Sequence, residues 1–151
     1  MANFTYAGTV GGVSPESKTF AVASGAAASI SIGDLVVIAN GYAAKVADGG
    51  GVNTSNFYGL ATTTSTDTAS ANGVVNVTFC PSGLIVQGIA TTPANLTAAV
   101  LYDKVTIDVS GSTQTVDEND TTNGGITIYE FVGTDYATTG LVKVLVPFAA
   151  S

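Results

Sequence analysis

The residues that could attack a chemical bond include Cys80, the single cysteine of a sequence that contains no histidine. A cysteine or serine nucleophile is commonly activated by a neighbouring histidine base, so neither pair can be assembled here. Cys80 ends an apolar stretch, precedes Pro81 and has no basic neighbour that would favour its thiolate. We therefore expect a buried or half-buried apolar residue, and a single cysteine excludes an intramolecular disulfide.

Carboxylates are the remaining route to catalysis or metal binding, with 11 acidic residues along the chain. Asp34 and Asp103 each precede an apolar stretch, and a matched pair of carboxylates could serve glycoside hydrolysis. The competing interpretation is that each aspartate caps a turn by accepting backbone N–H groups. Segment 117–120 offers oxygen ligands for Ca²⁺ but lacks the full spacing of a calcium loop, so it also fits a solvated acidic loop. We predict no enzymatic activity, no bound metal and no cofactor.

Charge, glycine and apolar patterns argue against several kinds of partner and location. The net charge is −7, and the few cations are scattered, which argues against binding to nucleic acid or to anionic membranes. The glycine run 49–51 is not followed by the Lys-Ser/Thr pair of a nucleotide-binding loop. No apolar run reaches the roughly 20 residues of a membrane-spanning helix. Residues 1–6 lack the basic and apolar regions of a secretory signal, so we expect assembly in a cytoplasm. The four lysines are Lys18, Lys45, Lys104 and Lys143.

Short apolar or alternating stretches separated by turn signals predict an all-β fold, a β-barrel or sandwich. Asn40-Gly41 is a typical tight-turn pair. Residues 93–99 are the one plausible helix, with a proline at its start, and too few helices are predicted to cover a parallel sheet. The predicted strands are 34–39, 42–47, 57–61, 74–79, 84–90, 104–109, 114–116, 126–132 and 141–147.

The predicted strands form an internal pseudo-repeat over about 33–81 and 102–147. Each copy begins with an aspartate before an apolar strand, continues through a turn to a short strand, and then has an aromatic strand. Each copy ends on a strand that precedes a proline, Pro81 in the first and Pro147 in the second. Neither copy alone has enough strands to bury an apolar face, so we expect the two to close one barrel or sandwich.

Residues 1–28 differ from the rest because glycine, proline and small residues interrupt any regular pattern. One interpretation is a first strand followed by a loop. The other, which we adopt, is an extended N-terminal arm over 1–28 that docks on a neighbour, followed by a single β-barrel domain over 29–151. Phe4, Tyr6 and Val10 are the candidate partner-binding residues, because they are apolar in a segment without an evident core. A chain so poor in charge has few residues to protect open strand edges, which favours oligomers.

Three stretches of the chain resemble the small capsid decoration (cement) proteins of tailed bacteriophages. They are Gly33-Asp34-Leu35-Val36-Val37, Asn40-Gly41-Tyr42-Ala43 and Phe57-Tyr58-Gly59-Leu60-Ala61, with a second unit starting at Asp103-Lys104-Val105. The resemblance covers roughly residues 30–147. In the second copy, Tyr102 stands where the pattern has glycine, and Glu130-Phe131-Val132 stand where it has Gly-Leu-Ala.

The resemblance implies a β-barrel or β-tulip-like subunit that forms a homotrimer and binds the major capsid protein. Such a subunit lies on the outer capsid surface of the virion, at local three-fold positions, and stabilises the expanded shell. The alternatives are another virion part (a head fibre, tail-tube or baseplate subunit) or a cell-surface adhesin or pilus-like subunit. An enzyme or sugar-binding module is a further alternative, which substitution of Asp34 or Asp103 would test.

Overall fold

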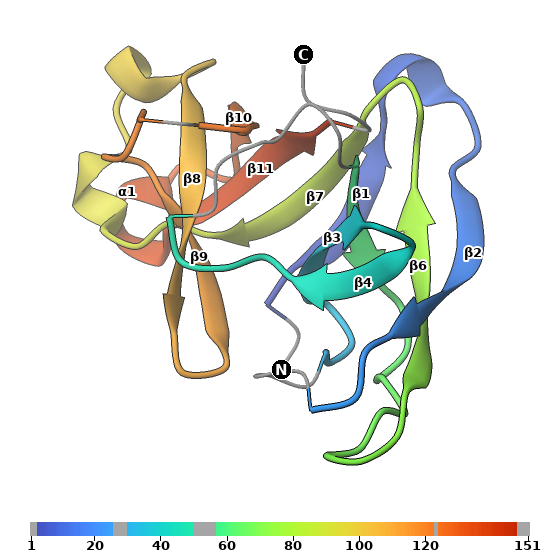
Figure 1. Cartoon of the computed structure of the whole chain (residues 1–151). Coiled ribbons are helices and arrows are strands. Elements are labelled where there is room, and N and C mark those ends of the chain that lie inside the picture. Colours follow the sequence, from blue (N-terminus) through green and yellow to red (C-terminus); the bar gives the residue numbers. More distant parts are fainter. Residues whose placement is uncertain (1–2, 26–29, 50–56, 123, 148–151) are drawn as a thin grey trace.

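The computed structural model describes residues 3–25, 30–49, 57–122 and 124–147, and the fold is all-β, as predicted (Figure 1). Part of the predicted loop at 49–56, beyond Gly49, and the predicted arm's residues 1–2 and 26–28 lie outside the described residues. The strands are β1 (Thr5–Thr9), β2 (Glu16–Val22), β3 (Leu35–Ala39), β4 (Tyr42–Lys45), β5 (Phe57–Ala61), β6 (Gly73–Phe79), β7 (Leu84–Ile89), β8 (Lys104–Ser110), β9 (Thr113–Asp117), β10 (Ile126–Phe131) and β11 (Leu141–Val146).

Helical structure in the described residues is limited to short segments. In place of the predicted helix over 93–99 there are two 3₁₀ turns, η2 (Pro93–Asn95) and η3 (Ala98–Val100). A third 3₁₀ turn, η1 (Val10–Gly12), follows β1, and a four-residue helix, α1 (Tyr136–Thr139), precedes β11. None of the helices in the described ranges is long and apolar enough to cross a membrane.

The first unit of the fold comprises β2 to β6, which close into a barrel in the order β2-β4-β3-β5-β6. β2 closes it by pairing along its whole length with β6 in an antiparallel manner, and with β4 in a parallel manner at Ala21 and Tyr42. The interior is a cluster of small and branched apolar side chains, typical of a narrow barrel. This cluster consists of Val22, Ile30, Val36, Ile38, Ala43, Ala61, Val75 and Val77.

The second unit comprises β7 to β11 and belongs to a six-stranded sheet of order β1-β7-β11-β10-β8-β9. This sheet curls back on itself, because Ala90, just after β7, forms an isolated parallel bridge with Val116 of β9. Thr91 reinforces the closure by donating its N–H to the carbonyl of Val116 at 2.8 Å. The larger apolar core lies inside this unit and extends to Leu35 and Tyr58 of the first unit.

The two units have the same topology, since β4-β3-β5-β6-β2 corresponds strand by strand to β9-β8-β10-β11-β7. The register corresponds as well: Ala61 pairs with Val77 in the first unit, and Ile128 pairs with Val144 in the second. Lys18 of β2 lies opposite Val77, and Val86 of β7 lies opposite Val144. Glu16–Thr19 of β2 are therefore equivalent to Leu84–Gln87 of β7.

The turns that begin β3 and β8 also correspond. Asp34 donates its N–H to the carbonyl three residues earlier, and so does Asp103. The residues before them, Gly33 and Tyr102, both have positive φ, at 89° and 70°. Tyr102 thus adopts the backbone conformation that glycine provides in the first unit, and its side chain is 67% exposed.

Two expectations about the arrangement are wrong. The two copies do not close one barrel together, because β2 supplies the first unit with the fifth strand that lets it close alone. Residues 1–28 are not an extended arm in the described part of that range, because β1 pairs with β7 and β2 belongs to the barrel. The alternative of a first strand comes closer, although it gives no place to the second strand, Glu16–Val22.

Candidate protein-binding surface

β1 is an edge strand of the six-stranded sheet. One side pairs with β7, and among the described residues no strand or backbone hydrogen bond covers the other side of Thr5–Thr9. Of the predicted partner-binding residues, Tyr6 is 50% exposed and Val10 is 37% exposed, and Val13 beside them is 49% exposed. This surface carries no charged residue between Asn3 and Pro15.

Phe4 does not belong to this surface, and its prediction as a partner-binding residue is wrong. Only 1% of it is exposed, because its side chain packs in the core of the second unit beside Gly88. Its N–H is donated to the carbonyl of Gly33 at 2.9 Å. Phe4 therefore anchors β1 to the fold, so that Tyr6 is held at the open edge.

The turn after β1 is fixed by contacts with the segment before β7. Val10 donates its N–H to the carbonyl of Gly83, and its own carbonyl accepts the Ser82 hydroxyl, both at 3.0 Å. The Val10 side chain lies over Gly83 and close to Leu145. The exposed apolar residues are thus presented on a positioned backbone.

β2 has a second open edge, over Glu16–Thr19. These residues pair with β6 on one side and are exposed, while β4 pairs only with the far end of β2 at Ala21. Figure 1 shows β2 at the margin of the molecule, outside β6. Glu16 and Lys18 point to the same face, because side chains alternate along a strand, and Lys18 Nζ lies 5.9 Å from the centre of the Phe20 ring.

Asp34 lies in a buried network. Its carboxylate accepts hydrogen bonds from Asn3 Nδ2 at 2.8 Å and from the Ser31 N–H at 2.9 Å, and it lies 3.3 Å from Lys45 Nζ. The Asp34 and Lys45 side chains are only 2% and 8% exposed. Asn3 and Lys45 also donate to the carbonyl of Ser112, at 3.0 and 3.1 Å. The network joins the N-terminal segment and the first unit to the β8–β9 turn.

Gln114 of β9 is a second buried link between the units. Its Oε1 accepts the Leu35 N–H at 2.8 Å, and its Nε2 donates to the carbonyls of Leu35 at 3.1 Å and Val46 at 3.3 Å. The side chain therefore pairs with the Leu35 N–H and the Val46 carbonyl, and it is a second donor to the Leu35 carbonyl, which also accepts the Val46 N–H. Sequence reasoning missed this residue, since a polar residue in a short strand gives no sign of a partner 79 positions away.

The remaining candidates for chemistry have local partners. Cys80 is buried, as predicted, with its Sγ 3.2 Å from Ser82 Oγ. Buried Glu118 accepts the Thr92 N–H and the Asn95 side chain, and Asp120 accepts the Thr106 hydroxyl. In the described parts of the chain, no three His, Cys, Asp or Glu side chains form a group that could hold a metal ion.

Asp48 and Asp108 form a carboxyl pair where the segment after β4 meets β8. Asp48 Oδ1 accepts the Val109 N–H at 2.9 Å, and the Gly49 N–H is donated to the carbonyl of Ile107. Partial burial, and then a hydrogen bond to the Asp48 carboxyl, raise the pKa of Asp108, although a hydrogen bond with Thr91 opposes this. The pair lies at a contact between the two units.

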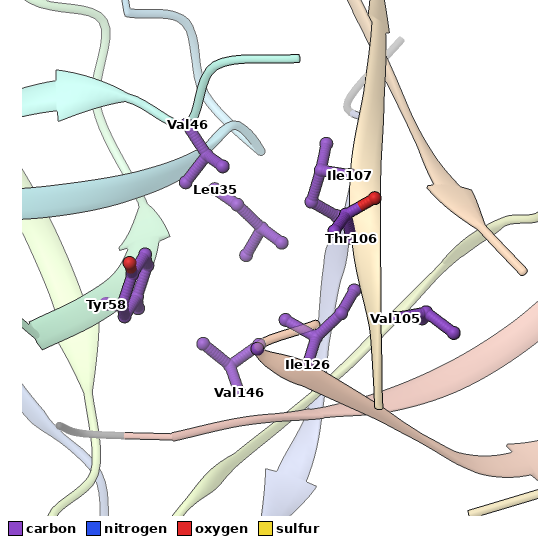
Figure 2. A pocket seen from close by; sticks show the side chains of 9 residues that line it. Leu35, Val46, Tyr58, Val105, Thr106, Ile107, Ile126 and Val146 are labelled. Carbon is purple, nitrogen blue, oxygen red and sulfur yellow. The ribbon is translucent and has the colours of Figure 1, made fainter. Parts of the chain in front are cut away.

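A small pocket, partly open to solvent, lies between the two units (Figure 2). Leu35, Val46 and Tyr58 line it from the first unit, and Ile107 and Val146 are among the residues facing them. The lining is almost entirely apolar. Figure 2 shows two hydroxyls in the lining, those of Tyr58 and Thr106, and the Thr106 hydroxyl is donated to Asp120. The pocket is therefore mainly an apolar packing space between the units.

Comparisons of this chain with protein-family models, with curated proteins and with solved structures found no match. The geometry therefore carries the functional argument. It offers two open strand edges, one of them uncharged and flanked by exposed apolar residues, on a body of two packed units. The buried polar residues described above are engaged in holding that body together.

Proposed function

We propose that this chain is a structural virion protein that binds the outer face of a tailed-bacteriophage capsid and stabilises the expanded shell. It acts by mass action, since a partner that binds only the expanded form favours that form. Its partners are the major capsid protein and further copies of itself in a homotrimer. No catalytic step is part of this function.

The observation that carries the proposal is the open edge of β1. A strand edge flanked by exposed Tyr6, Val10 and Val13, with no charge from Asn3 to Pro15, is suited to pairing with another protein. The resemblance of residues 30–147 to capsid decoration proteins favours the major capsid protein as this binding partner. The low content of charged residues fits a subunit that acts by binding to other proteins.

The test is co-sedimentation of the purified protein with expanded and with unexpanded heads of the phage that carries it. We expect saturable binding to expanded heads, weak binding to unexpanded heads, and a higher temperature of shell disruption when the protein is bound. A Tyr6→Asp/Val10→Asp variant, which charges the open edge, should bind less than the wild type. Absence of binding to either form of the head would refute the proposal.

Light scattering on a sizing column tests the homotrimer separately. A mass near three times 15.0 kDa is expected for the purified protein. A mass of 15.0 kDa at high concentration would remove the free trimer from the proposal, and trimerisation on the capsid surface would then have to be tested by cross-linking on heads.

A further inference from the structure

Within this chain, one of the two similar units already has an extra strand paired with its edge. β1 pairs antiparallel with β7 along Leu84–Gln87. The equivalent stretch of the first unit is Glu16–Thr19 of β2, and in the described part of the chain no strand pairs with that edge. One unit thus has an added strand where the other has an open edge.

The charge distribution favours contact between copies at these two edges. Each chain carries a net charge of −7, so two copies repel each other through their net charge. The surface of β1 is uncharged from Asn3 to Pro15, and the open edge of β2 carries one negative and one positive residue, Glu16 and Lys18. These edges can approach each other without like-charge repulsion.

We propose that the outer edge of β1 in one copy pairs antiparallel with Glu16–Thr19 of β2 in the next copy. This pairing continues the six-stranded sheet into the neighbouring molecule, from β7 through β1 to the neighbour's β2. It rests on the proposed function, because it names the surfaces that form the homotrimer. Since the two edges differ, the contact is heterologous, and the proposed homotrimer is a ring closed by three such contacts.

Pairing of like edges is the main competitor. Two β2 edges could meet about a two-fold axis at Ser17, which would place Glu16 of each copy opposite Lys18 of the other. The pairing within the chain favours the contact between unlike edges, because the β7 edge equivalent to Glu16–Thr19 pairs with β1. Each copy also has one β1 whose outer side no described strand covers. A ring of unlike contacts also leaves neither edge open, whereas a two-fold dimer through β2 leaves both β1 edges exposed.

Cysteine cross-linking distinguishes these arrangements. Ala7→Cys places a thiol on β1 and Thr19→Cys places one on β2, both at exposed positions. Cys80 is 1% exposed and stays in place, so the wild-type protein is the background control. Thr134→Cys, at an exposed position outside both edges, is the matched control. The folded full-length variants are treated with a short bis-maleimide and separated under denaturing conditions.

We expect covalent species of two and three chains from the Ala7→Cys/Thr19→Cys double variant, and two-chain species from a mixture of the two single variants. Each single variant alone should stay at the wild-type background. Cross-linking of Thr19→Cys alone or of Ala7→Cys alone would show that like edges meet, and would overturn the proposal. So would a double variant that does not cross-link, or that forms a ladder extending beyond three chains.

These outcomes are separate from the capsid test. A three-chain product together with absence of binding to heads would refute the capsid function and leave the edge pairing intact. Binding to heads by a double variant that fails to cross-link would refute the edge pairing and leave the capsid function intact.

Discussion

The ring of Phe4 fills the space that a side chain at Gly88 would need. A Cβ atom on Gly88 would lie 2.3 Å from Phe4 Cε1. The equivalent position in the first unit is Phe20, whose ring lies 5.6 Å from that of Phe57 and 6.3 Å from that of Phe79. The first unit is therefore filled by its own phenylalanine, and the second by one that β1 delivers.

Phe4→Ala should lower the free energy of unfolding by about 3–5 kcal/mol, because it leaves a cavity in the larger core. Gly88→Ala should cost about 1–3 kcal/mol, because its methyl group forces the ring to move. In the double variant the added methyl occupies part of the cavity, so the loss should be smaller than the sum. Urea unfolding measures all three variants. Ile32→Ala, at a residue that is 56% exposed and lies outside both open edges, is the control, with an expected change within about 0.5 kcal/mol.

The buried ion pair of Asp34 and Lys45 gives a second prediction. Lys45→Met should lower the free energy of unfolding by about 3–5 kcal/mol, because it leaves the Asp34 carboxylate buried without its cation. Asp34→Asn/Lys45→Met should lose less than Lys45→Met alone, since no unpaired charge is then buried. Thermal and urea unfolding provide the comparison.

The matched control is Lys143→Met, which removes a half-buried lysine that lies 3.3 Å from the exposed Glu130. Exposed pairs contribute about 0–1 kcal/mol, so this variant should unfold almost as the wild type does. Equal losses for Lys45→Met and Lys143→Met would contradict a structural role for the buried pair.

Local patterns in the sequence account for much of the fold. The strand predicted over 57–61 is β5, and the tight turn at Asn40-Gly41 joins β3 and β4, with positive φ at both residues. These elements depend on neighbours in sequence: alternation, β-branched residues and turn chemistry. β2 was missed because Glu16–Thr19 are polar and exposed, and a strand held mainly by its backbone pairing with β6 has no apolar alternation to reveal it.

The candidate surface could be predicted only in part. Tyr6 and Val10 are exposed as their prediction requires, but Phe4 has the same apolar type and the opposite location. The locations differ because Gly88 leaves room for the ring of Phe4, which lies 84 positions earlier in the chain. Asn3 and Gln114 likewise act on distant partners, so only the three-dimensional structure assigns them a role.

Gln114 gives the third prediction. Gln114→Leu should lower the free energy of unfolding by about 2 kcal/mol or more, because the buried Leu35 N–H and the Val46 carbonyl lose their partner, and the Leu35 carbonyl keeps only the Val46 N–H. Gln87→Leu makes the same change on half-buried β7 and should have little effect. Native-state hydrogen exchange offers a site-specific check, with faster exchange expected at the Leu35 amide in Gln114→Leu alone.

The carboxyl pair of Asp48 and Asp108 gives the fourth prediction, on pH. The pKa of Asp108 is raised in the folded protein. In the unfolded chain an aspartate has a pKa of about 3.9. The folded state therefore binds the carboxyl proton of Asp108 more tightly than the unfolded chain does. This group's contribution to the free energy of unfolding therefore falls as the pH rises from the unfolded pKa to the raised one, and is constant above it. Asp108→Asn removes the titrating carboxyl and with it this fall. The free energy of unfolding of the variant, relative to that of the wild type, should therefore rise as the pH increases between the two pKa values. Urea unfolding at a series of pH values, from about 3.9 up to neutrality, measures the difference. Asp135→Asn removes one exposed carboxylate elsewhere, and an equal rise in that variant would show that net charge, and not the pair, is responsible.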